Sequence, residues 1–253
     1  MWTDLKDKVV IVTGGGMGIG KVYVQAFSNQ RCKVVAADIN YAGAEQVAQE
    51  LNTDGTMVLP VEVDVSNSES VSRMVQKAVE TFGGIDILVN NAALMSALPR
   101  RTWFEIPLSE WDEVMSVNVR GAFLCCLSVF PYMKQRSKGK IINISSNRVF
   151  EGTPYRLHYT ASKAAMIGFT RALAREVGEY NICVNAVTPG LTASETELAV
   201  VKPEHFQATS EKRCLKRLEV PQDLVGTVLF LASSASDFIT GQTINVDGGY
   251  IMH

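Results

Sequence analysis

Short apolar runs alternate along this chain with longer segments whose apolar residues recur at helical spacing. The short runs are rich in β-branched residues and mostly apolar throughout, which is typical of strands covered on both faces. This alternation predicts parallel strands joined by crossover helices. Strands are predicted at Lys8–Thr13, Lys33–Asp38, Thr56–Val63, Asp86–Asn91, Lys140–Ser145, Asn181–Val187 and Thr243–Val246. Helices are predicted at Gly18–Asn29, Ala42–Asn52, Ser68–Phe82, Ser109–Gln135, Tyr155–Glu179 and Pro221–Ser233.

Two of these helices carry start signals, and one later segment lacks a regular pattern. Asp112 follows Ser109 by three residues, and Pro221 stands where a first helical turn begins. The stretch Leu191–Leu218 is polar and weakly periodic. Because long structureless loops in compact domains are usually functional, we expect a lid over a site at about residues 191–218. Without repeats or linkers, residues 1–253 form one α/β domain.

Composition and charge exclude several classes of protein. The 253 residues are 47% hydrophobic, and 24 basic side chains against 26 acidic ones give a net charge of −2. With no basic block longer than Arg100-Arg101, we expect neither nucleic acid nor a membrane as partner. The N-terminal residues lack a signal-peptide pattern, and no stretch holds 18 uncharged apolar residues. We therefore expect a cytoplasmic protein.

The cysteines favour a reducing compartment. They number five, an odd set without C-x-x-C spacing, so they predict neither disulfides nor a zinc site. We expect buried thiols and no metal site; Cys214, in a polar segment, is the one cysteine to test for reactivity.

The first predicted strand runs into a glycine-rich turn, TGGGMGIG at residues 13–20, followed by a helix. Glycines let backbone N–H groups approach phosphate oxygens, and the helix dipole favours that charge. The pattern is T-G-x-x-x-G-x-G through Gly14, Gly18 and Gly20. A P-loop is excluded because Val22 stands where that motif requires a hydroxyl. A tight turn that binds no ligand is the alternative.

Asp38 bears on the identity of a bound dinucleotide. It closes the second predicted strand, 18 residues after Gly20, and no arginine follows it. A carboxylate there can accept hydrogen bonds from both ribose hydroxyls of adenosine and would repel a 2′-phosphate. The sequence therefore predicts NAD over NADP, unless Asp38 merely caps the next helix. Asp64, at the end of the third strand, either approaches the adenine amino group or caps a turn.

A candidate catalytic group follows the fifth strand. Tyr159 and Lys163 stand at i and i+4 of a predicted helix, hence on one face. Ser146 ends the fifth strand, at the sheet edge where parallel sheets bind ligands. We expect Tyr159 to transfer the hydroxyl proton during hydride transfer, with a pKa lowered by Lys163 and the nicotinamide ring. Ser146 would hydrogen-bond the substrate oxygen.

At these motifs the sequence resembles the short-chain dehydrogenase/reductase family in its simpler, single-domain form. The resemblance covers essentially the whole chain. Its motifs are TGGGMGIG at 13–20, Asp38, Asp64, NNAA at 90–93, Asn118, Ser146, YTASK at 159–163 and Pro189-Gly190. It implies a doubly wound Rossmann fold with a seven-stranded parallel sheet and helices on both faces.

The resemblance also implies roles for individual residues. Asn118 becomes the fourth catalytic residue, which bends its helix and holds a water that passes protons from Lys163 to solvent. Ala93 replaces a glycine usual in the family, and Thr192 comes earlier than the usual threonine, so its place near the phosphates stays open. The residues implied at the cofactor are Gly14, Met17, Gly18, Ile19, Gly20, Asp38, Asp64, Val65, Asn91, Ala92, Tyr159, Lys163, Pro189, Gly190, Leu191 and Thr192.

The substrate is less defined than the reaction. The residues expected to contact it are Ser146, Arg148, Phe150, Tyr155 and Tyr159. Arg148 either meets an anionic group or is a solvated rim residue, whereas His158 is interpreted as a packing residue. By analogy with relatives that oxidise cyclic or aryl alcohols, we expect an NAD-dependent dehydrogenase of a small secondary or cyclic alcohol.

Two alternatives stay open at this point. One is a 3-oxoacyl-thioester reductase, and the other is a dinucleotide-binding regulator without turnover. Apolar residues in Phe123–Tyr132 and Met166–Ala174 exceed what one contact face needs. Together with the family resemblance, they predict a homotetramer.

Overall fold

A seven-stranded parallel sheet forms the centre of the molecule. We describe it from a computed structural model, in which residues 2–52 and 57–252 are placed. The strand order is β3-β2-β1-β4-β5-β6-β7, and each neighbouring pair is parallel. The strands are β1 (Val9–Thr13), β2 (Lys33–Asp38), β3 (Met57–Glu62), β4 (Ile87–Asn90), β5 (Gly139–Ile144), β6 (Ile182–Pro189) and β7 (Thr243–Val246). The order reverses between β1 and β4, the point at which open α/β sheets bind ligands.

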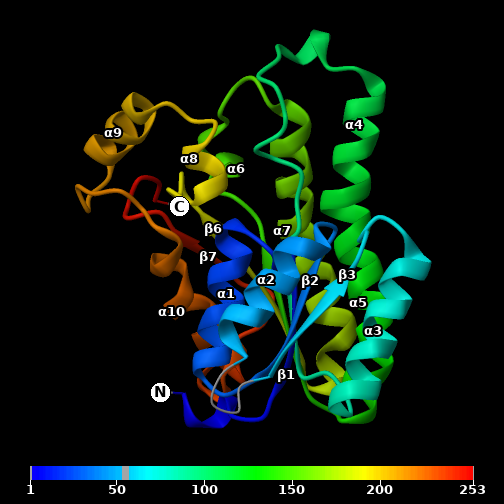
Figure 1. Cartoon of the computed structure of the whole chain (residues 1–253). Coiled ribbons are helices and arrows are strands. Elements are labelled where there is room, and N and C mark those ends of the chain that lie inside the picture. Colours follow the sequence, from blue (N-terminus) through cyan, green and yellow to red (C-terminus); the bar gives the residue numbers. More distant parts are fainter. Residues whose placement is uncertain (1, 53–56, 253) are drawn as a thin grey trace.

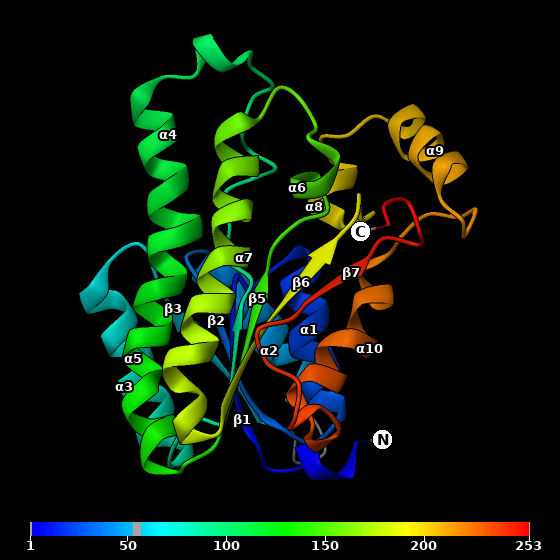
Figure 2. The same cartoon turned by 180° about the vertical axis from the view of Figure 1, so that it is seen from behind.

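Helices cover both faces of this sheet (Figures 1 and 2). One face carries α1 (Gly18–Asn29), α2 (Tyr41–Leu51) and α10 (Pro221–Ala232). The opposite face carries α3 (Ser68–Phe82), α5 (Gly121–Gln135) and α7 (Leu157–Val177). The shorter helices are α4 (Leu108–Met115), α6 (Arg148–Glu151), α8 (Glu195–Leu198) and α9 (Pro203–Lys212). The predicted doubly wound fold is confirmed.

The central strand β1 shows why its residues Val9–Val12 are all apolar. Val10 and Val12 pack into the core cluster that holds α1, α2 and α10 residues. Val9 and Ile11 point the other way, into the cluster that holds α3, α5 and α7 residues. Successive side chains of a strand alternate between faces, so burial on both sides requires a continuous apolar run.

Several predicted boundaries are wrong. The fourth predicted helix begins at Leu108, with Pro107 and not Ser109 at the N-cap position. The α7 helix begins at Leu157, because Tyr155 has a left-handed backbone with φ of 72°. Thr56, predicted to start the third strand, lies outside the described residues. The predicted start of α10 at Pro221 is confirmed.

The segment predicted as a structureless lid contains two helices, α8 and α9. The apolar periodicity used to predict helices is weak in this segment, because short helices that project from a sheet bury few apolar residues. Figure 1 shows both helices beyond the ends of the strands, beside β6 and β7. The prediction of buried thiols is confirmed for four cysteines and wrong for Cys214, which is exposed.

The segment Leu108–Gln135 consists of α4, a π-helical turn η3 (Ser116–Arg120) and α5. By length and composition alone it could cross a membrane, with a hydropathy of 1.5 over its most apolar window. Core helices pass the same test, and 39% of this window is buried against the rest of the protein. The segment is therefore weak evidence of a membrane span.

Candidate active site

One large cleft lies where β1, β2, β4, β5 and β6 end. It encloses about 1300 Å³, more than the roughly 300–1,000 Å³ of an ordinary small-molecule pocket. Every residue that the sequence assigns to the cofactor lines it. Ser146 and Arg148 line it as well. The cleft therefore brings the dinucleotide motifs and the predicted catalytic residues together.

The glycine-rich turn is fixed by the end of β4. The Oγ1 of Thr13 accepts hydrogen bonds from the backbone N–H groups of Asn91 and Ala92, both at 3.1 Å. The Asn91 side chain donates to the carbonyls of Thr13 and Gly14, at 3.0 and 3.1 Å. A Cβ on Gly20 would lie 1.8 Å from the Gly14 carbonyl oxygen. Only glycine therefore fits at position 20.

Asp38 faces the same end of the cleft and is 6% exposed. Its two oxygens accept the backbone N–H groups of Gly16, at 2.8 Å, and Asn40, at 2.9 Å. The N-cap of α2 is Asn40, whose side chain accepts the Gly43 N–H. The alternative that Asp38 caps this helix is therefore wrong. Each carboxylate oxygen keeps acceptor capacity for a ligand hydroxyl.

Asp64 caps a turn and also lines the cleft. Its Oδ1 accepts the backbone N–H of Ser66 at 2.9 Å and the Ser66 hydroxyl at 2.7 Å. The two interpretations of Asp64 are thus compatible.

Tyr159, Lys163 and Ser146 meet at the other end of the cleft. The Lys163 Nζ lies 5.8 Å from the centre of the Tyr159 ring and donates to the Ile144 carbonyl at 2.8 Å. The Ser146 hydroxyl is close enough to the Tyr159 phenol to oppose part of the rise in its pKa. All three side chains are at least nine-tenths buried. The predicted pair on one helix face is therefore present.

Burial dominates the electrostatics of Tyr159 within the protein itself. Burial raises the pKa of its phenol to about 12, and the largest opposing influence is the positive charge of Arg148. The Lys163 amine lies 5.8 Å from the centre of the Tyr159 ring and donates its hydrogen bond to the Ile144 carbonyl, not to the phenol. Burial also lowers the pKa of Lys163 itself to about 8. The prediction that Lys163 and the nicotinamide ring together lower the pKa of Tyr159 concerns the complex with the dinucleotide and stays a prediction.

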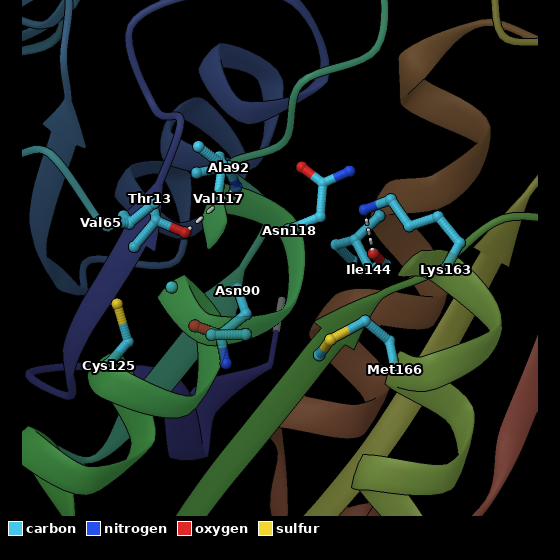
Figure 3. A pocket seen from close by; sticks show the side chains of 12 residues that line it. Thr13, Val65, Asn90, Ala92, Val117, Asn118, Cys125, Ile144, Lys163 and Met166 are labelled. Carbon is cyan, nitrogen blue, oxygen red and sulfur yellow. Dashed lines mark hydrogen bonds between the residues drawn. The ribbon is translucent and has the colours of Figure 1, made fainter. Parts of the chain in front are cut away.

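Asn118 stands inside the π-helical turn, consistent with the implied bend. Its Oδ1 accepts the Leu94 N–H at 2.8 Å, and its Nδ2 donates to the Leu94 carbonyl and to Ser162 Oγ, at 3.3 and 3.0 Å. Asn118 and Lys163 approach one side of a small cavity (Figure 3). Its volume of about 10 Å³ corresponds to roughly one water molecule. The buried Oδ1 of Asn90, without a hydrogen-bond partner among the described residues, also faces this region.

The lid contributes three site residues that the sequence interpretation missed. The Glu195 carboxylate accepts the backbone N–H of Gly18 at 2.9 Å, at the N-terminus of α1. Thr196 lies beside the same glycine, where an added Cβ would meet its hydroxyl at 3.1 Å. Glu197 accepts a hydrogen bond from the Ser96 hydroxyl. The family's later threonine was the only signal in the sequence that could have indicated Thr196.

Thr192 points into a buried network. Its hydroxyl donates to Glu219 at 2.7 Å, and Glu219 also pairs with Arg213 at 3.0 Å. Thr192 is only 3% exposed. Its hydroxyl therefore holds the lid to this network, and Thr196 is the threonine closer to the glycine turn.

Two predicted substrate contacts lie away from the cleft. Tyr155 and Phe150 are not among its lining residues. The left-handed backbone turns the Tyr155 side chain toward Arg100, whose guanidinium lies 5.2 Å from the ring centre. His158 is buried, with its Nε2 3.2 Å from a Glu110 carboxylate oxygen, in line with a packing role.

A C-terminal turn completes the cleft. The buried Asp247 carboxylate accepts the backbone N–H groups of Gly249, Tyr250 and Ile251, at 3.1, 3.0 and 3.1 Å. Tyr250 lines the cleft, and its hydroxyl donates to Glu151 at 2.7 Å. No motif in the sequence indicated that Tyr250 would line the cleft.

Comparison with known proteins agrees with this geometry. A family model described as enoyl-(acyl carrier protein) reductase matches residues 14–251. An uncharacterized oxidoreductase of Mycobacterium tuberculosis is 41% identical, over 97% of this chain and 98% of its own. A probable galactose dehydrogenase of Rhizobium meliloti is 38% identical, over 97% and 96%. A crystal structure of 3-ketoacyl-(acyl-carrier-protein) reductase from Brucella melitensis with NADH is 32% identical, with a TM-score of 0.90 over 98% of this chain and 100% of that chain.

The chain belongs to the short-chain dehydrogenase/reductase family. It is an oxidoreductase with a Rossmann-like fold. Ala93, where the family usually has glycine, does not have a positive φ, so alanine fits there without strain.

Proposed function

We propose that the protein is an NAD-dependent dehydrogenase of small secondary or cyclic alcohols, which also reduces the matching ketones. The observation that carries this proposal is a single cleft with Asp38 at one end and Ser146, Tyr159 and Lys163 at the other. The Asp38 carboxylate suits the ribose hydroxyls of NAD and opposes the phosphate of NADP.

The side chains of the cleft suit a dinucleotide whose adenosine lies at the Asp38 end and whose nicotinamide lies at the Tyr159 end. Asp38 would hold the adenosine ribose, and the glycine turn would bind the pyrophosphate. The backbone of residues 189–191 and Lys163 would hold the nicotinamide end. When bound, NAD supplies the hydride acceptor, chemistry that no protein side chain offers.

The protein's own groups move the proton. Tyr159 takes the hydroxyl proton of the alcohol during oxidation and returns it to the ketone oxygen during reduction. Ser146 donates a hydrogen bond to the same oxygen as charge develops on it. With its pKa raised to about 12 by burial, the phenol alone is protonated at neutral pH and ready to act as an acid. Arg148 favours the phenolate that oxidation requires.

A 3-oxoacyl-thioester reductase is the second candidate. It is supported by the Brucella melitensis structure, whose title names a 3-ketoacyl-(acyl-carrier-protein) reductase. Asp38 opposes an enzyme that depends on NADPH, although that structure holds NADH.

The test is NADH formation at 340 nm with a panel of alcohols, including 1-phenylethanol and cyclohexanol. We expect kcat/KM to be higher with NAD than with NADP. Removing the acid–base hydroxyl in Tyr159→Phe should lower kcat at least about 100-fold while NADH still binds. A near-normal rate for Tyr159→Phe would contradict the mechanism, and a preference for NADPH with acetoacetyl-CoA would favour the second candidate.

We also propose a cytoplasmic homotetramer. The support is an exposed apolar strip on α5, where Phe123 is 49% and Leu127 56% exposed. Apolar patches of this kind mark protein interfaces. Light scattering tests it, and a monomer would contradict it.

A further inference from the structure

Arginines gather at the substrate end of the cleft. Arg148, Arg156 and Arg100 all line it, and each reaches it from a different segment. Arg148 follows Ser146 by two residues, and its backbone N–H donates to Ser146 Oγ at 3.3 Å. The Arg148 guanidinium lies near the proton-transfer group, because its charge is the largest influence that opposes the raised pKa of Tyr159.

Two of these guanidinium groups are incompletely paired. Arg148 uses only its Nη2, which donates to the carbonyls of Pro154 at 3.2 Å and Thr153 at 3.5 Å. Arg156 uses Nη1 toward the sulfur of Met95 and Nη2 toward a backbone carbonyl, both at 2.8 Å. In each case the Nε is buried and has no acceptor within the described part of the chain. Buried donors without acceptors are rare in folded proteins.

Carboxylates of the protein do not neutralise this group. Among residues 2–52 and 57–252, neither Arg148 nor Arg156 has a carboxylate oxygen within 4.0 Å. The nearby Glu151 accepts hydrogen bonds from Thr153 and Tyr250. The nearby Glu197 accepts one from Ser96. Three arginines face two glutamates at this end, and the Nη1 of Arg148 donates to no acceptor in the described structure.

Arg148 and Arg156 are also partly buried, which lowers the pKa of both guanidinium groups. Placing two arginines in one cleft at this cost is consistent with a ligand that restores the lost interactions. A planar carboxylate matches the guanidinium fork and can accept two parallel hydrogen bonds.

We propose that the substrate is an anionic secondary alcohol or ketone whose carboxylate binds Arg148, with Arg156 adding to the positive field. This inference rests on the proposed function and narrows it to hydroxy acids and oxo acids. The nucleotide phosphates do not account for Arg148, because it lies at the Ser146 end of the cleft and Asp38 lies at the other.

Matched substrates that differ only in charge test the inference. The pairs are 3-hydroxybutanoate against 3-hydroxybutanamide, and 4-(1-hydroxyethyl)benzoate against its carboxamide. A hydrogen-bonded charge pair predicts an acid-to-amide ratio of kcat/KM of about 10 to 100 in the better pair. Arg148→Gln should bring this ratio close to one. Arg148→Lys should leave an intermediate ratio, because it keeps the charge but loses the fork.

The ratio separates direct binding from a general effect on Tyr159, which would change both members of a pair alike. Arg73→Gln is the matched control, since Arg73 is exposed on α3 and makes only a long ion pair of 4.0 Å. It should keep the wild-type ratio. A wild-type ratio of one or less in both pairs would overturn the inference, as would an unchanged ratio in Arg148→Gln.

The two proposals fail in different ways. If 1-phenylethanol or cyclohexanol yields NADH and both acids are the poorer members of their pairs, only the anion inference fails. If no alcohol is oxidised, the proposed function fails. In that case, NADH fluorescence measures how tightly acetoacetate and acetoacetamide bind to the protein–NADH complex. The acid-to-amide ratio of these affinities then tests the inference.

Discussion

The two ends of the cleft differ in how completely their polar groups are paired. At the adenosine end, both oxygens of Asp38 accept backbone N–H groups, and Asn91 uses its amide to hold the glycine turn. At the substrate end, the Nε atoms of Arg148 and Arg156 and the Oε2 of Glu197 are buried without partners in the described structure.

An unpaired buried polar group costs about 1–3 kcal/mol. Proteins tolerate that cost mainly at functional sites, where a ligand completes the hydrogen bonds. The difference therefore indicates that the adenosine end is the more preorganised of the two, and the proposed anionic substrate would add hydrogen bonds at the other end.

The largest expected effect is at the adenosine end. Gly20→Ala would place a methyl group against the Gly14 carbonyl, where an ideal Cβ lies at 1.8 Å. The turn must then move, and we expect NADH binding to weaken more than about 100-fold, roughly 3 kcal/mol. NADH fluorescence titration measures the affinity, and thermal unfolding measures the accompanying loss of stability.

Gly226→Ala provides the control for that change. Gly226 lies in α10 and nothing stands within 4 Å of an added Cβ. Alanine at an exposed helix position is expected to stabilise the protein by up to about 1 kcal/mol and to leave NADH binding unaltered. An affinity of Gly20→Ala within threefold of the wild type would show that the turn is not preorganised.

An intermediate effect is expected from pH at the substrate end. Tyr159 must be ionised to accept a proton, and burial raises its pKa to about 12. Below that pKa the phenolate fraction rises about tenfold per pH unit, so kcat/KM for alcohol oxidation should increase with pH. Ketone reduction needs the protonated phenol and should not increase. Profiles between about pH 6 and 9 with saturating NAD or NADH measure both directions.

Arg148→Gln sharpens this test. Removing the positive charge that opposes the raised pKa of Tyr159 should move the oxidation profile to higher pH. Arg73→Gln should not move it. A flat oxidation profile would argue against Tyr159 as the base.

The smallest expected effect concerns the lid at the glycine turn. The Glu195 carboxylate occupies the Gly18 N–H, which points to where a phosphate would bind. Glu195→Gln removes a negative charge from the helix N-terminus and should tighten NADH binding about two- to fivefold. Glu204→Gln on α9, an exposed residue outside the cleft, should change nothing. Weaker binding by Glu195→Gln would mean that this carboxylate helps to hold the dinucleotide.

The fold and the adenosine end could be predicted because they depend on local signals. Apolar strands such as Val9–Thr13 are identified by composition, and the turn needs glycine for steric reasons that spacing reveals. Tyr159 and Lys163 share a helix, so their proximity follows from their spacing of four residues.

The substrate end was predicted less well because it depends on tertiary placement. The left-handed backbone of Tyr155 carries no sequence signature, and it turns that side chain out of the cleft. Glu197 and Tyr250 reach the site from a polar lid and a C-terminal turn, where residue type alone says nothing of position. The direction of the Lys163 amine could not be predicted either, since it depends on the Ile144 carbonyl of another element.

The turn around Asp247 has a consequence for how the protein is made. The glycine turn, Asp38 and β4 leave the ribosome early, whereas Tyr250 emerges more than 200 residues after Asp38. The wall that Tyr250 forms is therefore the last part of this cleft to be synthesised. A chain that still lacks this turn has an unfinished catalytic chamber.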